Sequence, residues 1–235
     1  MPPPRVSIVR DWSRRPPRGG VAVVIDVLRF STTLCSLVRA GRRRIRVARD
    51  PQSLQQTPGI DYADVFSELD FAAKGRRFDN SPHQAIAARA PGRAAFVTTT
   101  TGSRAAFASR GARRVLIGCF ANFEVLIRRL SRVRGAVRLV PAATAAACPG
   151  SVEDECCASA IVEALRGDPE AGGKALARLR QSPRVAQFLR ARPRWGHEDL
   201  AYCLNLNRLP VLPELVFGPG REPVLARVRP TRKPG

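Results

Sequence analysis

Short apolar runs alternate along this chain with longer amphipathic stretches, and this alternation predicts the fold. The run Val21–Ile25 holds five consecutive apolar residues, which is typical of a strand buried on both faces. Further strands are predicted at 44–47, 62–66, 94–97, 115–117 and 137–140, and helices at 31–40, 51–56, 82–90, 103–109, 122–133 and 152–165. This order predicts an α/β fold, with a mixed or mostly parallel sheet and helices on both faces.

The pattern changes beyond residue 167. Three short amphipathic stretches, at 175–180, 184–192 and 198–206, predict a smaller helical C-terminal part over about 168–207. Pro210 and Pro213 limit the stretch 209–215 to an edge strand. Residues 1–20, apart from an edge strand at 6–9, are predicted to form a flexible arm, and 218–235 a disordered tail, because both are rich in proline and arginine. One α/β domain is therefore expected at 21–217.

The first strand-helix unit carries candidate chemistry. Asp26 and Arg29 follow the strand Val21–Ile25, and the hydroxyl residues 31–33 are placed to cap the next helix. In α/β folds the ligand binds beyond the carboxyl ends of the strands. A carboxylate there can hold a metal ion, and an arginine beside a helix N-terminus can hold a phosphate. The alternatives are that Asp26 only caps the turn and that Arg29 forms a surface ion pair.

Other polar segments also follow predicted strands. They are the segments 98–102, 118–122 and 141–150, together with the mixed-charge loop 67–82. The loop 67–82 contributes Glu68 and Asn80, and the segment 141–150 leads into Glu153 and Asp154. Because the carboxyl ends of parallel strands meet at one edge of a sheet, these segments are expected to converge on one site.

The residue types in these segments suit the hydrolysis of a phosphate ester. The predicted ligands of a hard cation, Mg²⁺, are Asp26, Glu68, Glu153 and Asp154. The predicted catalytic residues are Asp26, Arg29 and Asp154, since a metal can activate water and an arginine can neutralise phosphoryl oxygens. The predicted substrate-binding residues are Ser31, Thr32, Asn80, Thr99, Thr100, Gly102, Ser103, Arg104 and Asn122.

Structural roles remain open for several of these residues. Glu153 and Asp154 can compensate the charge of a helix N-terminus, and Ser151 with Asp154 can form a capping pair. Asn80 and Asn122 can cap helices. Direct attack by water and a route through a phosphorylated aspartate are both compatible with these residues.

Several known motifs are missing. Leu28 stands where the haloacid dehalogenase signature has its second aspartate, so Asp26 is not predicted to be a nucleophile of that type. The chain also has no Walker phosphate loop and no glycine fingerprint of a dinucleotide-binding fold.

The composition adds a strong positive charge. Lysine and arginine number 40 against 19 aspartates and glutamates, giving a formal net charge of +21. The arginines are spread through nearly every predicted element and aromatic residues make up only 6%, so a nucleic-acid partner is not favoured. The chain lacks an apolar run of the ~20 residues that span a membrane and an apolar signal segment, so a cytoplasmic protein with no membrane partner is expected. A monomer and a homodimer both remain open.

The six cysteines form no C-x-x-C pair. The two histidines, His83 and His197, lie far apart in the sequence. A zinc site is therefore not expected, and the cysteines are predicted to be reduced thiols.

Six motifs stand in order along the chain: V-I-D-V-L-R-F-S-T-T (24–33), F-D-N-S-P (78–82), T-T-T-G-S-R-A (99–105), I-G-C-F-A-N (117–122), E-D-E-C-C-A (153–158) and L-P-V-L-P (209–213) preceded by Glu198, Asp199 and Cys203. Their order and spacing resemble the 2-phosphosulfolactate phosphatase family over roughly residues 21–215. The resemblance implies an α/β fold, an Mg²⁺ cofactor and a small phosphorylated anionic substrate. The implied reaction, known from coenzyme M biosynthesis, converts (2R)-2-phospho-3-sulfolactate to 3-sulfolactate and phosphate.

Three motifs depart from the family pattern. Thr101 and Ser103 replace the asparagine and the last threonine of a T-T-N-G-T turn, residues 67–71 replace a G-E-R-G-G loop, and 78–82 shorten an F-D-L-G-N-S-P motif. Loss of glycine can reshape a phosphate pocket, because glycine lets the backbone approach a ligand closely. The alternative function is therefore a catalytically inactive or repurposed α/β protein that binds an anion, including nucleic acid.

Overall fold

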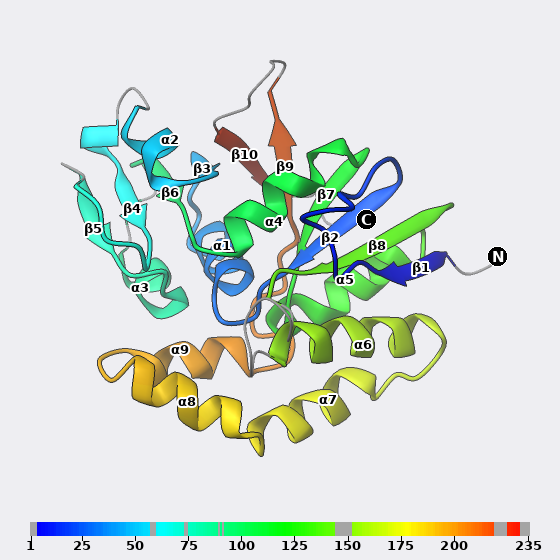
Figure 1. The fold of residues 1–235 in the computed structure, drawn as a ribbon. Helices are drawn as coiled ribbons and strands as arrows, with labels where there is room; N and C mark the ends of the chain where they lie inside the picture. The colour runs from blue at the N-terminus through cyan, green and yellow to red at the C-terminus, as the bar shows by residue number, and fades with distance from the viewer. Residues whose placement is uncertain are drawn as a thin grey trace.

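The computed structural model describes residues 4–56, 60–72, 75–88, 90, 92–143, 152–218 and 225–230. The described strands form one ten-stranded sheet in the order β1-β8-β2-β7-β9-β10-β3-β6-β4-β5 (Figure 1). The strands are β1 (Arg5–Ile8), β2 (Val21–Ile25), β3 (Ile45–Ala48), β4 (Asp64–Phe66), β5 (Arg76–Phe78), β6 (Ala95–Val97), β7 (Arg114–Gly118), β8 (Ala136–Pro141), β9 (Pro213–Phe217) and β10 (Leu225–Pro230).

Helices follow most strands, as the alternating pattern predicts. They are α1 (Phe30–Arg39), α2 (Pro51–Gln55), α3 (Pro82–Ala87), α4 (Gly102–Ala108), α5 (Phe123–Leu130), α6 (Glu153–Leu165), α7 (Ala171–Arg180), α8 (Pro183–Ala191) and α9 (Gly196–Cys203), with short 3₁₀ turns at Ile60–Tyr62, Ser109–Gly111 and Phe120–Asn122. The predicted α/β class, with a mixed sheet, flanking helices and a helical C-terminal part, is confirmed (Figure 1).

The sheet consists of two parallel halves joined through antiparallel strands. One half is β1-β8-β2-β7 and the other is β3-β6-β4-β5, and all neighbours within each half pair in parallel. Strands β9 and β10 lie between the halves and pair antiparallel with β7 and β3 and with each other. The carboxyl ends of the parallel strands therefore point to one side of each half, where the loops of interest begin.

The central strand β2 is fully enclosed, as its continuous apolar run predicts. Residues 22–25 are completely buried between the neighbouring strands β8 and β7. Gly118, at the end of β7, allows α5 to pack closely against the sheet. A Cβ atom there would lie 2.7 Å from Leu126 Cδ2 and 2.7 Å from Val23 Cγ1, so a larger residue would push α5 away.

Two predictions about the C-terminal end were wrong. The stretch 209–215 does not end in an edge strand, because β9 lies inside the sheet between β7 and β10. Pro213 is tolerated because it is the first residue of β9, where its missing N–H leaves the ladder intact. Residues 225–230, which fall in the predicted disordered tail, form β10. They pair with β3 and β9, whose backbone groups would otherwise be left without sheet partners.

The N-terminal arm is also more ordered than predicted. The expected edge strand is confirmed as β1, which pairs with β8 at the end of the sheet. The prediction of a flexible arm does not hold at Trp12. Its side chain packs against the core and donates a hydrogen bond from Nε1 to Pro141 O at 3.0 Å. An indole buried on one side and bonded on the other anchors the segment.

The helical C-terminal part lies along one side of the sheet. In Figure 1, α7 and α8 lie along the bottom, below the strand ends, with α6 above α7 and α9 above α8. Helix α7 packs on α6, and α9 packs on α3 and α8. This layer covers the strand ends that carry the candidate site. No helix in the described part of the chain is long and apolar enough to cross a membrane.

A buried ion cluster joins β4 to its surroundings. The Asp64 side chain is fully buried and accepts hydrogen bonds from Arg42 (2.5 Å), Arg76 (2.8 and 2.9 Å) and Arg93 (3.0 Å). Burial alone would raise the pKa of Asp64, but the guanidinium groups of Arg76 and Arg42 outweigh it and lower that pKa. The cluster ties the loop after α1 to two strands of the second half-sheet.

We predict that Asp64→Asn lowers the free energy of unfolding by about 3 kcal/mol, because it leaves the buried guanidinium group of Arg42 without its counter-charge. Urea denaturation followed by circular dichroism measures the effect, with the fully exposed Asp70→Asn as control. Since the pKa of Asp64 is lowered in the folded state, its stabilisation exists above the ordinary aspartate range and is lost as pH falls through the lowered value. The difference in unfolding free energy between wild type and Asp64→Asn should become smaller in acid. A difference that does not change with pH would contradict this role of Asp64.

Candidate active site

A cavity of about 310 Å³ lies beyond the strand ends, between the sheet and α8. Its polar lining comes from six segments: Asp26 and Arg29 after β2, Glu68 after β4, Asn80 after β5, Thr100 and Thr101 after β6, Glu153 and Asp154 on α6, and Arg184 and Arg192 from α8 and its C-terminal end. All the residues predicted to be catalytic or metal-binding therefore line one cavity. Their roles remain predictions, but the expected convergence of loops is present.

Asp26 directly follows the carboxyl end of β2, in the turn that leads into α1. Its Oδ1 accepts from Phe30 N at 3.0 Å, and its Oδ2 has only a long contact with Thr101 Oγ1 at 3.4 Å. The hydrogen bond from the N-terminus of α1 thus holds Oδ1 in place, while Oδ2 faces the cavity. Burial first, and then the charges of Glu68 and Glu153, raise the pKa of Asp26 to about 7.

Asp154 connects three segments around the cavity. Its Oδ1 accepts from Val27 N at 2.8 Å and its Oδ2 accepts from Ala143 N at 2.9 Å. Burial, followed by the charges of Asp26 and Glu153, raises the pKa of Asp154 well above its usual range. Asp154 therefore holds the loops after β2 and β8 together. The capping partner Ser151 that the sequence predicts lies outside the described residues.

Glu153 is held by an arginine that the sequence analysis did not select. Arg184 on α8 forks onto it, with Nε 3.0 and 2.9 Å from the two carboxylate oxygens and Nη2 2.8 Å from Oε1. Glu153 is buried and Arg184 is partly buried. This ion pair fastens α8, and with it the C-terminal helices, to the start of α6 beside the cavity. If Glu153 only compensated the charge of the helix N-terminus, it would not make this link.

Two buried oxygen atoms on the cavity wall have no hydrogen-bond partner among the described residues. Glu68 Oε1 accepts from Thr100 N at 2.8 Å and Thr100 Oγ1 at 3.1 Å, but Glu68 Oε2 has none. Asn80 Oδ1 is likewise buried without a partner, and the adjacent Ser81, not Asn80, caps α3. Because an unsatisfied buried oxygen is costly, such atoms indicate a place for a donor or a cation.

Arg29 is not free to act as the open phosphate fork that the sequence predicts. Its Nη1 and Nη2 donate to the two oxygens of Asp79 at 2.8 and 2.9 Å, and Nη1 also donates to Asp199 Oδ2 at 2.5 Å. Burial alone would lower the pKa of Arg29, but these carboxylates outweigh it and raise the pKa, so the group stays charged. The guanidinium also faces the Phe188 ring at 5.7 Å. Arg29 thus ties the β2 turn to α9.

The hydroxyls at the start of α1 face the backbone. Ser31 Oγ accepts from Asp26 N at 3.0 Å, and Thr32 Oγ1 donates to Val27 O at 3.0 Å. Neither lines the cavity, and neither caps α1, whose N-cap is Arg29 without a side-chain cap. In the structure Ser31 and Thr32 make positioning contacts to the backbone, because tight packing turns both side chains inward, and their contact with substrate stays a prediction.

The turn before α4 is rigid, and most of it faces away from the cavity. Thr99 and Ser103 exchange backbone-to-hydroxyl hydrogen bonds at 2.9 and 3.0 Å, and both are buried. A Cβ atom on Gly102 would lie 2.6 Å from Asp26 Oδ2, so glycine is needed for this close approach. Of this predicted phosphate turn, only Thr100 and the neighbouring Thr101 line the cavity.

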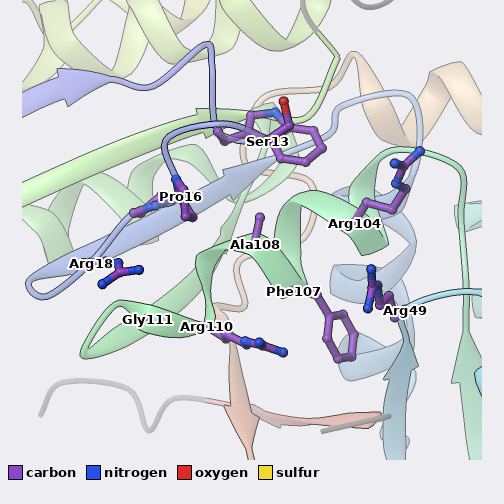
Figure 2. Close-up of a pocket in the computed structure, with 11 residues that line it drawn as sticks. Ser13, Pro16, Arg18, Arg49, Arg104, Phe107, Ala108, Arg110 and Gly111 are labelled. Carbon is purple, nitrogen blue, oxygen red and sulfur yellow. The ribbon is translucent and has the colours of Figure 1, made fainter. Parts of the chain in front are cut away.

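Two predicted substrate-binding residues lie elsewhere. Arg104 is on the exposed face of α4 and lines a different pocket (Figure 2). Asn122 is fully buried: its Oδ1 accepts from Cys119 N, and its Nδ2 donates to Ile117 O and Val211 O. Asn122 occupies the N-cap position of α5 without a side-chain cap bond. It joins β7 to the segment before β9 instead.

Sequence reasoning missed the contribution of α8 and of two aspartates. Arg184, Phe188 and Arg192 line the cavity from α8 and its end, and Asp79 and Asp199 hold Arg29. The F-D-N-S-P motif contains Asp79, and the late motif match includes Asp199, so these two positions carried a signal. The arginines of α8 carried none, since amphipathic helices near the C-terminus are rich in exposed arginine.

The oxygen atoms around the cavity fit a hard cation. Asp26 Oδ2, Glu68 Oε2 and Asn80 Oδ1 have free acceptor capacity, and oxygen is the ligand that Mg²⁺ prefers. Within the described residues, no three acidic, histidine or cysteine side chains already form a ready-made metal site. Mg²⁺ in proteins usually takes one or two carboxylates and completes its shell with water and substrate phosphate.

Comparison with known proteins shows which family the chain belongs to. An α/β fold with a polar cavity beyond its strand ends defines a protein suited to a small-molecule substrate. A family model described as 2-phosphosulpholactate phosphatase matches residues 11–217. The chain belongs to this family of phosphoric monoester hydrolases, which confirms the resemblance.

Individual relatives match over nearly their full length. A protein of Symbiobacterium thermophilum named "Probable 2-phosphosulfolactate phosphatase" is 33% identical over 225 residues, covering 85% of this chain and 93% of that protein. Proteins of the same name from two Synechococcus strains are each 30% identical, covering 86% and 83% of this chain and 91% and 88% of the relatives.

We predict that Asp26→Asn stabilises the metal-free protein at pH 8 but not at pH 5. The pKa of Asp26 is raised to about 7 in the folded state, so its favourable contribution is present in acid and is lost as pH rises through about 7. The melting temperatures of wild type and Asp26→Asn, recorded in EDTA, measure this stabilisation. The difference between the two should grow from pH 5 to pH 8, whereas the difference between wild type and a control variant should not. The exposed Asp70→Asn serves as control, and parallel pH profiles for wild type and Asp26→Asn would contradict the raised pKa.

Proposed function

We propose that this protein is an Mg²⁺-dependent phosphatase that hydrolyses 2-phosphosulfolactate to 3-sulfolactate and phosphate. Family membership and the names of the relatives support the substrate class. The charge balance of the cavity around Asp26 supports the need for a cation.

That charge balance is the observation that carries the proposal. Four carboxylates line the cavity: Asp26, Glu68, Glu153 and Asp154. Of the three arginines there, Arg29 is neutralised by Asp79 and Asp199 and Arg184 by Glu153, while Arg192 forms no ion pair with a described residue. With Asp26 and Asp154 ionised, such a cavity would repel a phosphate dianion, and a bound cation both favours their ionised forms and offsets the repulsion.

Asp26 and Glu68 are the proposed Mg²⁺ ligands, with Asp154 and Asn80 completing the polar wall. Bound Mg²⁺ supplies Lewis-acid stabilisation of the phosphoryl oxygens and a more acidic water. Asp154 keeps its hydrogen bonds to Val27 N and Ala143 N and so fixes the distance between the two loops. Thr100 N and Oγ1 orient Glu68.

Arg192 is the proposed contact for the second acidic group of the substrate. It lies at the C-terminal end of α8 and lines the cavity, and its one hydrogen bond within the described part of the chain goes to Ala191 O at 3.1 Å. A guanidinium matches the planar or trigonal oxygens of a carboxylate or sulfonate. Phe188 and Leu28 add apolar wall beside it.

The cytoplasm is the proposed location. The described cysteines, Cys35, Cys119, Cys156, Cys157 and Cys203, are all free thiols, which suits a reducing compartment.

Phosphate release from 2-phosphosulfolactate tests the function. We predict release with Mg²⁺, none with EDTA, and a loss on the order of 100-fold or more in kcat/KM for Asp26→Asn. Metal-independent release, or full activity of the folded Asp26→Asn variant, would rule out the assignment.

We predict that Arg192→Ala raises KM for 2-phosphosulfolactate by about ten-fold, because one charge-assisted contact is lost. The exposed Arg190→Ala on the same helix is the matched control and should leave KM unchanged. Phospholactate, which lacks the sulfonate, distinguishes the contact: a smaller effect on phospholactate assigns Arg192 to the sulfonate. Equal KM values for wild type and Arg192→Ala on both substrates would exclude the contact.

A further inference from the structure

A second and larger pocket, of about 590 Å³, lies on another part of the surface. It is bounded by residues 12–18 before β2, by the end of β3, and by α4 with the turn Ser109–Gly111 (Figure 2). None of its lining residues lines the cavity around Asp26. The proposed phosphatase reaction therefore leaves this pocket without a role.

The charge of this second pocket is strongly positive. Four arginines line it, each from a different segment: Arg18, Arg49, Arg104 and Arg110. Among the described residues, no acidic side chain lines it. Of the four arginines only Arg49 approaches a described carboxylate, with its Nε 4.0 Å from Asp50 Oδ2. Positive groups gathered without counter-charge raise the local potential, and an anion bound between them relieves it.

Part of the pocket lining is apolar, namely Trp12, Phe107 and Ala108, which we call the apolar floor, and two of these side chains are held in place. Trp12 is anchored by its hydrogen bond to Pro141 O, and Phe107 packs edge-on against Phe217 with ring centroids 5.5 Å apart. Gly19 N donates to Gly111 O at 2.9 Å, which fastens the segment before β2 to the turn after α4. The arginines thus surround a built pocket rather than a loose surface.

We propose that the pocket between α4 and residues 12–18 binds a small organic polyphosphate of the nucleoside triphosphate class. Guanidinium groups fork onto phosphate oxygens, and four of them match an anion with several phosphates better than a single phosphate. The volume lies in the range of drug-sized ligand sites, and the floor of Trp12, Phe107 and Ala108 offers contact to the uncharged part of the ligand. A nucleic-acid strand would need a continuous basic groove that follows its backbone, whereas these arginines line one bounded pocket.

Helix α4 borders both sites. It contributes the exposed Arg104 and the largely buried Phe107 to the basic pocket, while Gly102 at its first turn lies against Asp26 and Phe30. The two sites are thus separate in their lining but share one rigid element.

Titration calorimetry at fixed ionic strength tests the proposal with ATP, pyrophosphate and inorganic phosphate as probes. EDTA is present throughout, so that the acidic cavity around Asp26 has no cation with which to bind a phosphate. We expect one ATP per chain, bound at least about ten-fold more tightly than either inorganic probe. Pyrophosphate binding as tight as ATP would overturn the role of the apolar floor and hence an organic ligand.

The decisive comparison uses two double variants with the same loss of charge. Arg104→Ala/Arg110→Ala removes two arginines of the pocket and should weaken ATP binding roughly 100-fold, about ten-fold for each charge-assisted contact. Arg43→Ala/Arg132→Ala removes two exposed arginines outside the pocket and should change it less than about three-fold. Equal losses in both variants would mean that ATP responds only to the overall charge of +21, which overturns the site.

A conservative variant separates binding from folding. Arg104→Lys/Arg110→Lys keeps the charge but loses the fork, and should bind ATP with an affinity between those of wild type and the alanine variant. Absence of ATP binding by folded wild type would overturn the proposal. So would tighter binding of a mixed-sequence oligonucleotide that displaces ATP, since that outcome would assign the basic pocket to nucleic acid.

Discussion

The structure depends on holding several buried carboxylates close together beyond the carboxyl ends of the parallel strands. Asp26 and Asp154 repel each other and Glu153, yet backbone N–H groups of Phe30, Val27 and Ala143 fix them. The first bond lies within the turn after β2, and the two bonds of Asp154 link α6 to the segments after β2 and β8, so the arrangement of these three ends follows from satisfying the carboxylates. The repulsion that remains is the physical reason for a cation in the proposed chemistry.

Much of the fold and part of the site could be predicted from local sequence. The continuous apolar run of β2 and the polar residues after the strands placed Asp26, Glu68, Asn80 and Asp154 correctly around one cavity. These signals are local, because a strand end and its loop are adjacent in the chain. The parallel geometry then brings successive strand ends to the same side.

The rest depends on contacts between segments distant in sequence. The network of Arg29 with Asp79 and Asp199 spans 170 residues, and the contact of Arg184 with Glu153 depends on how α8 packs. No local pattern distinguishes such an arginine from the many that face solvent. The same limit explains β9 and β10, whose place inside the sheet results from pairing with β7 and β3 rather than from their own proline-containing sequences.

The central claim is that a cation binds between Asp26 and Glu68 and makes the acidic cavity receptive to a phosphorylated anion. The most direct test is a crystal structure with Mn²⁺ in place of Mg²⁺ and the product 3-sulfolactate, read from the anomalous signal of the metal. The account predicts a single peak within coordination distance of carboxylate oxygens of Asp26 and Glu68, with the product beside Arg192. A metal bound elsewhere, or a product-bound cavity without metal, would contradict it.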